Sequence, residues 1–144
     1  LQADGLLLRP LTENGWFRTG DLGHFDDAGY LHVTGRRDNM FISGGENIQP
    51  EEIEQALRDI EGVEEAIVVP VEDAEWGKRP AAFVRFHDEK RAIDAAEIDQ
   101  ALRRVLPGYK IPRAIYPWPA DLAQPGLKPA RRDFEKRAGE LGAP

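Results

Sequence analysis

Three segments of the sequence combine charged side chains with glycine in a way that suits binding of a small anion. They read FRTGD at 17–21, GRRD at 35–38 leading to SGGEN at 43–47, and GLKPAR at 126–131. Arginine and lysine pair with phosphate or carboxylate oxygens, carboxylates accept hydrogen bonds, and paired glycines allow close approach to the backbone. Each segment alone also has an ordinary explanation, as a turn, a surface ion pair or a solvated lysine.

The composition excludes several other kinds of chemistry. The chain has 144 residues, a formal net charge of -7 and no cysteine. Disulfides, thiol nucleophiles and thiolate metal sites are therefore excluded, and the acidic balance argues against nucleic-acid binding. The histidines lack metal-ligand spacing, so we predict no metal site. No apolar run reaches the ~20 residues that span a bilayer, and no signal peptide is recognisable. We expect a cytoplasmic protein, and the missing initiator methionine suggests a fragment of a longer chain.

Hydrophobic patterning predicts the elements that position these segments. A β-hairpin is expected at 22–26 and 29–35, joined by turn residues at 26–29. A strand follows at 40–43 and ends at paired glycines. A helix begins at Pro50 and buries a stripe at i, i+4 and i+7. That stripe consists of Ile53, Leu57 and Ile60.

The hydrophobic pattern in the second half of the chain predicts alternating strands and helices. Strands at 63–71 and 80–86 flank a loop at 73–78, and a capping box at 94–97 begins another helix. That helix carries Ile98, Ala101, Leu102, Val105 and Leu106 on one side. A proline-interrupted edge strand at 109–118 and a final helix at 130–141 complete the pattern. The prediction is an α+β fold, a small mixed β-sheet with packed helices preceded by a β-hairpin segment.

In this order, the three segments resemble the C-terminal signatures of the adenylate-forming superfamily. Its members include acyl-CoA synthetases, luciferases and the adenylation domains of peptide synthetases. Residues 36–52, VPVED at 69–73 and GLK at 126–128 are most similar to its bacterial o-succinylbenzoate-CoA ligases. The resemblance implies an AMP-forming acid–thiol ligase of menaquinone biosynthesis, which forms an acyl-adenylate and then an acyl-CoA thioester. Another acyl- or aryl-CoA ligase, a carrier-loading adenylation domain and, for the isolated chain, a non-catalytic module remain alternatives.

The resemblance also implies a division of the chain and a set of ligands. Residues 1–36 correspond to the end of the large N-terminal domain, and residues 37–144 to the mobile C-terminal domain. The partners are the missing N-terminal domain and a small carboxylate substrate, with no nucleic acid and no membrane span. The cofactors are ATP and coenzyme A, and Mg²⁺ accompanies ATP with ligands outside this chain.

The matching motif positions give each candidate residue a role. Lys128 is the catalytic residue, which reaches the substrate carboxylate and the α-phosphate during adenylation. Asp21 binds the ribose of ATP or AMP, Arg36 contacts the nucleotide near its phosphate and ribose, and Asp38 is the hinge. The residues assigned to coenzyme A are Gly44, Gly45, Trp76, Tyr109, Lys110 and Arg113. Structural alternatives are a core position for Trp76, a loop anchor for Tyr109 and a tight turn for the glycines.

One position departs from the family pattern. Ile111 stands where some aryl-CoA ligases carry a basic residue. The resemblance therefore does not imply how the phosphates of coenzyme A are bound at that position.

Overall fold

The computed structural model describes residues 11–88, 90–122 and 130–142. The strands are β1 (Asp21–Phe25), β2 (Leu31–Arg36), β3 (Phe41–Ser43), β4 (Glu46–Ile48), β5 (Val63–Asp73), β6 (Gly77–Phe86) and β7 (Ala114–Pro117). The α-helices are α1 (Pro50–Arg58), α2 (Ala95–Arg103) and α3 (Arg131–Leu141). Three 3₁₀ turns are η1 (Arg37–Asn39), η2 (Gly108–Lys110) and η3 (Ala120–Leu122). Within these described ranges, no helix has the length and apolar character needed to cross a bilayer.

The strands form separate small sheets instead of one. β1 and β2 form an antiparallel hairpin, as do β3 and β4. The third sheet has the order β5-β6-β7, with β5 and β6 antiparallel and β6 and β7 parallel, so it is mixed as predicted. The expected edge strand at 109–118 is shorter than predicted, because η2 occupies its beginning and only Ala114–Pro117 pairs with β6.

Helices cover both faces of the mixed sheet. Val68 and Val69 are consecutive in β5, so their side chains point to opposite faces, and both are fully buried. Val68 belongs to a core cluster that includes Leu57 of α1 and Leu102 of α2. Val69 belongs to a second cluster with Phe134 of α3. The sheet is therefore the central layer of the C-terminal body, which we define as residues 40–142 as far as the structure describes them.

The sequence patterns that predicted α1 and α2 are confirmed in part. Ile98 and Leu102 are buried on α2, but the helix ends at Arg103, so Val105 and Leu106 lie beyond it and Val105 is exposed. Ile53 and Leu57 are fully buried, whereas Ile60 lies just beyond the end of α1 and is half-buried. The carboxylate of Asp94 caps α2 by accepting hydrogen bonds from the amides of Ala96 and Glu97. The side chain of Glu97 does not complete the capping box, because it pairs with the Arg91 guanidinium at 3.1 Å.

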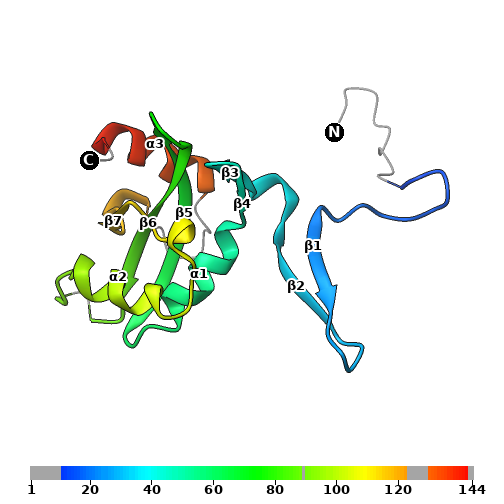
Figure 1. Cartoon of the computed structure of the whole chain (residues 1–144), viewed down its shortest axis with the longest axis horizontal. Coiled ribbons are helices and arrows are strands. Elements are labelled where there is room, and N and C mark those ends of the chain that lie inside the picture. Colours follow the sequence, from blue (N-terminus) through cyan, green and yellow to red (C-terminus); the bar gives the residue numbers. More distant parts are fainter. Residues whose placement is uncertain (1–10, 89, 123–129, 143–144) are drawn as a thin grey trace.

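The β1–β2 hairpin projects from the C-terminal body (Figure 1). Phe25, Leu31 and Val33 are exposed on it, although each is a large apolar residue. η1 connects the hairpin to β3, so the predicted hinge residue lies in this connection.

Candidate functional site

The residues predicted to bind the nucleotide, Asp21 and Arg36, meet at the open end of the hairpin. Asp21 begins β1 and Arg36 ends β2, and the antiparallel register places them opposite each other. The Arg36 Nη1 atom lies 3.5 Å from Asp21 Oδ1, and Nη2 donates to the carbonyl of Thr19 at 3.3 Å. The Arg36 side chain is 54% exposed and the Asp21 side chain 40%. A guanidinium and a carboxylate therefore lie side by side within reach of a ligand.

Asp38 occupies the middle of η1, and its side chain is exposed. Its neighbour Asn39 donates a hydrogen bond of 2.5 Å to Glu51 Oε1 on α1. A single 3₁₀ turn therefore links the hairpin to the C-terminal body. This is the kind of element terminus at which a few backbone dihedrals absorb a domain rotation.

Gly44 and Trp76, both assigned to coenzyme A, are in direct contact. The amide of Gly44 donates to the carbonyl of Trp76 at 2.9 Å. A Cβ atom built on Gly44 would lie 2.2 Å from the Trp76 ring, and its φ is +56°. Glycine is therefore required here by the indole as well as by the turn. An added Cβ on Gly45 would meet nothing within 4 Å, although its φ of +87° also favours glycine.

Asp73 holds the turn that presents Trp76. Its Oδ1 atom accepts hydrogen bonds from the amides of Glu75 and Trp76, both at 2.9 Å, and Arg113 pairs with Oδ2. The amide of Trp76 lowers the pKa of the Asp73 carboxyl below its ordinary value, and the Glu75 amide and the charge of Arg113 add to this against the effect of burial. Arg113 thus lies near the same turn, but a carboxylate already engages it.

The turn at Asp73 predicts a specific dependence on pH. The pKa of the Asp73 carboxyl in the folded chain lies below its ordinary value of 3.8. The hydrogen bonds of the Asp73 carboxylate therefore contribute their full stability above pH 3.8. The contribution is lost as the pH falls through the lowered folded pKa. We expect the Trp76 amide resonance, followed by NMR from neutral pH downward, to move with a midpoint below 3.8. Asp73→Asn removes the titrating group and should abolish the movement, whereas a midpoint above 3.8 would contradict this account.

A second group of predicted coenzyme A residues lies on η2. Lys110 Nζ is 2.5 Å from Glu52 Oε2 in the first turn of α1 and 5.7 Å from the centroid of the Tyr109 ring. Tyr109 is half-buried against the core cluster of α1 and α2, which fits the loop-anchor alternative. Ile111 is 2% exposed and belongs to that core, so its side chain is unavailable to a phosphate. An apolar residue at this position therefore has a structural reason.

Lys128 lies outside the described residues, as does the rest of 123–129. Helix α3 begins three positions after it, at Arg131. Among the residues that the structure does describe, no group of three or more histidine, aspartate or glutamate side chains is arranged to hold a metal ion.

The sequence reasoning missed a buried ion pair that joins α1 to α3. Glu54 Oε1 accepts from Arg131 Nη1 at 2.6 Å and from the amide of Val68 at 2.9 Å, while Arg131 also donates to the Val68 carbonyl. β5 is the edge of its sheet, so the two side chains satisfy backbone groups that have no neighbouring strand. The available signal was an acidic residue at an inward position of α1, between Ile53 and Leu57.

The sequence reasoning also missed the role of Glu51. Its carboxylate faces Asn39, Gln49 and the Arg131 Nη2 atom, the last at 3.8 Å. Burial by itself raises the pKa of Glu51. The hydrogen bonds from Asn39, its own amide and Gln49, with the charge of Arg131, outweigh burial and lower the pKa below its ordinary value. Glu51 is thus held as a carboxylate beside the predicted hinge.

Comparison with known proteins gives a consistent result. Residues 52–124 match the family described as AMP-binding enzyme C-terminal domain. The 2-succinylbenzoate–CoA ligase of Oceanobacillus iheyensis is 47% identical over 104 residues, which are 72% of this chain and 21% of that protein. The same enzyme of Salmonella typhimurium is 38% identical over 133 residues, 92% of this chain and 28% of that protein.

Solved structures give the same picture. A variant of E. coli MenE with bound OSB-AMS has a TM-score of 0.83 and 30% identity, covering 96% of this chain and 29% of that one. Apo MatB from Rhodopseudomonas palustris has a TM-score of 0.73 and 31% identity, covering 91% of this chain and 26% of that one. The chain therefore spans less than a third of the length of these relatives.

Proposed function

This chain belongs to the family of AMP-binding enzyme C-terminal domains, and from that premise we propose that it is the C-terminal part of an AMP-forming acid–CoA ligase. The observation that carries the proposal is the grouping of its motif residues on either side of Asp38. Asp21 and Arg36 pair on the hairpin, whereas Gly44 and Trp76 meet in the C-terminal body. Two groups separated by a hinge suit an enzyme that performs two successive reactions with one mobile domain.

In the first reaction the substrate carboxylate attacks the α-phosphate of ATP, forming an acyl-adenylate and releasing pyrophosphate. In the second, the thiol of coenzyme A attacks the acyl carbon, forming a thioester and releasing AMP. Asp21 accepts hydrogen bonds from the ribose hydroxyls, Arg36 pairs with nucleotide oxygens, and Lys128 stabilises the charge that develops on the α-phosphate. Mg²⁺ accompanies ATP and takes its ligands from the rest of the protein.

We extend the proposal to the division of the chain and to the substrate. Residues 1–36 belong to the large domain and residues 37–144 form the mobile one. The exposed apolar side chains of the hairpin support this division, since a larger domain would cover them. We assign o-succinylbenzoate as the substrate, because the similar proteins of Oceanobacillus iheyensis and Salmonella typhimurium are 2-succinylbenzoate–CoA ligases.

The experiment that tests the function uses the full-length protein that contains this chain. Pyrophosphate release with ATP and a panel of aryl and aliphatic carboxylates measures the first reaction, and thioester formation with coenzyme A measures the second. We expect both with o-succinylbenzoate. Acylation of a carrier protein without any free thioester would support the carrier-loading alternative instead, and no adenylate with any carboxylate would refute the proposal.

The hinge role of Asp38 gives a second prediction. Asp38→Pro fixes φ at residue 38 near −65°, a value typical of the 3₁₀ turn that it already occupies. We expect the variant to retain most adenylate formation and to lose most thioester formation, because only one orientation remains accessible. Asp38→Ala is the matched control, since it removes the carboxylate but leaves the backbone free. Equal loss of both reactions in the proline variant would show that residue 38 is not the hinge.

A further inference from the structure

The backbone of Arg36 is hydrogen-bonded from the far side of the hinge. Gln49 Nε2 donates to the Arg36 carbonyl at 3.1 Å, and the Arg36 amide donates to Glu51 Oε1 at 3.4 Å. Arg36 precedes Asp38 by two residues and ends β2, whereas Gln49 and Glu51 follow it at the N-terminus of α1. Both hydrogen bonds therefore span the hinge.

The two side chains that make these bonds are also fixed to each other. Gln49 Nε2 donates to Glu51 Oε2 at 2.5 Å, and Glu51 Oε1 accepts a further bond from Asn39. Gly35 is buried against them, and a Cβ atom there would lie 2.2 Å from Gln49 Nε2 and 2.6 Å from Glu51 Oε2. A side chain at position 35 would therefore displace Gln49 and Glu51 from their observed places.

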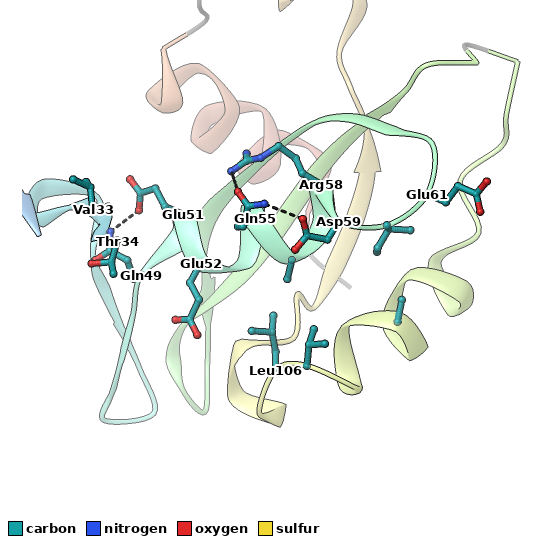
Figure 2. A pocket seen from close by; sticks show the side chains of 15 residues that line it. Val33, Thr34, Gln49, Glu51, Glu52, Gln55, Arg58, Asp59, Glu61 and Leu106 are labelled. Carbon is teal, nitrogen blue, oxygen red and sulfur yellow. Dashed lines mark hydrogen bonds between the residues drawn. The ribbon is translucent and has the colours of Figure 1, made fainter. Parts of the chain in front are cut away.

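A groove beside these contacts has walls from both sides of the hinge. Val33, Thr34 and Gly35 of β2 form one wall, and α1, the turn after it and the end of α2 form the other. Figure 2 shows Gln49 and Glu51 beside Val33 and Thr34 at one end of this groove. A rotation of the C-terminal body about Asp38 must change the distance between these walls.

We propose that Gln49 and Glu51 are positioning residues that form a latch across the hinge, holding the C-terminal body in the observed orientation. The latch consists of the Gln49 and Glu51 side chains and the Arg36 backbone that they engage. Rotation about Asp38 separates Arg36 from both side chains, whereas the bond from Asn39 to Glu51 joins two residues that both follow Asp38 and therefore persists. The role of the latch in catalysis rests on the proposed function, but its effect on orientation does not.

Loss of the latch should shift the population of orientations by an amount that can be measured. Two hydrogen bonds, one of them long, correspond to about a tenfold change in the equilibrium between latched and rotated states. If the two half-reactions use different orientations, the ratio of their rates must change by a similar factor. A merely structural defect would instead lower both rates together.

The first test uses the chain itself, which has no cysteine and accepts labels only where they are introduced. Spin labels on Asp27→Cys in the hairpin turn and Arg104→Cys at the end of α2 report orientation by pulsed electron paramagnetic resonance. We expect one dominant distance in the unaltered background. The double variant Gln49→Ala/Glu51→Ala should show a second distance, enriched about tenfold, and Gln49→Ala alone a smaller enrichment.

Asp59→Asn is the matched control, because Asp59 lines the same groove but its side chain bonds Gln55 on its own helix. It should leave the distance distribution unchanged. An unchanged distribution in the double variant, with native circular dichroism, would overturn the latch.

The second test measures both half-reactions in the full-length protein carrying Gln49→Ala/Glu51→Ala. We expect the ratio of pyrophosphate release to thioester formation from supplied adenylate to change about tenfold, and to stay constant in Asp59→Asn. A constant ratio in the double variant would refute the catalytic role of the latch. Absence of both reactions in the unaltered protein would refute the proposed function, and the spin-label result would still decide whether the latch exists.

Discussion

Lys128→Ala in the full-length protein should lower the rate of acyl-adenylate formation by about a thousandfold while sparing thioester formation from supplied adenylate. Negative charge builds on the α-phosphate during the first reaction. A cation ~4 Å away contributes about 4 kcal/mol at an effective dielectric near 20, which corresponds to roughly a thousandfold in rate. In the second reaction the proposed rotation of the mobile domain carries this lysine away from the phosphate, so its removal should not slow that step.

The measurement is single-turnover release of pyrophosphate, followed by thioester formation from synthetic adenylate. Lys136→Ala is the matched control, because Lys136 is an exposed lysine on α3 whose partner is Glu140, four residues later. That variant should behave like the unaltered protein. Normal pyrophosphate release by Lys128→Ala would remove this lysine from the catalytic machinery.

Arg131→Met should destabilise the chain by about 3 kcal/mol, the largest effect that we expect on folding. The Glu54 and Arg131 side chains are 8% and 19% exposed, and removing the guanidinium leaves the Glu54 carboxylate buried without a cation. Breaking a buried ion pair from one side costs about 3–5 kcal/mol, and partial exposure of Arg131 places the expectation at the lower end. The Val68 carbonyl also loses its donor at the sheet edge.

Urea unfolding of the 144-residue chain, followed by circular dichroism, measures this effect. Arg132→Met is the control, since Arg132 is the next residue of α3, 87% exposed, and its change should stay within about 0.5 kcal/mol. Glu54→Gln/Arg131→Met should recover part of the loss, because a neutral amide oxygen still accepts from Val68 without a buried charge. Equal stability of Arg131→Met and Arg132→Met would show that the pair does not stabilise the fold.

The ion pairs of Arg131 with Glu51 and Glu54 connect parts of the chain that the proposed mechanism requires to act together. Glu51 contacts η1 through Asn39 and lies 3.8 Å from Arg131, and Arg131 in turn holds the start of α3 against β5. The predicted hinge and the helix that follows the Lys128 segment are thus joined through one turn of α1. A change at Glu51 is expected to affect orientation, whereas a change at Glu54 is expected to affect stability.

The sequence by itself determined the features that depend on local pattern. The i, i+4 spacing of Ile53 and Leu57 placed α1, and the carboxylate of Asp94 placed the start of α2. The order of the three motif segments identified the family, which the match at residues 52–124 confirms. The same motifs predict the roles of Lys128 and of the hinge, and these stay predictions.

Only the tertiary structure decided which motif residues are already engaged by the protein. Arg113 pairs with Asp73, 40 residues away, Lys110 pairs with Glu52, and Ile111 is buried in the core. Sequence spacing carries no information on such contacts, because they join elements that meet only after the sheet has assembled. The same holds for the contact of Gly44 with the Trp76 ring.

The latch and the buried pair show the physical reason most clearly. Glu51 and Glu54 lie on one turn of α1 and have the same side chain, yet Glu51 faces the end of β2 and Glu54 faces the edge of β5. Helical periodicity fixes the angle between the Glu51 and Glu54 side chains, and their spacing in the sequence predicts that angle. The partner that each meets depends on how β2 and α3 pack against α1, and that packing is set by the long-range contacts of the folded chain.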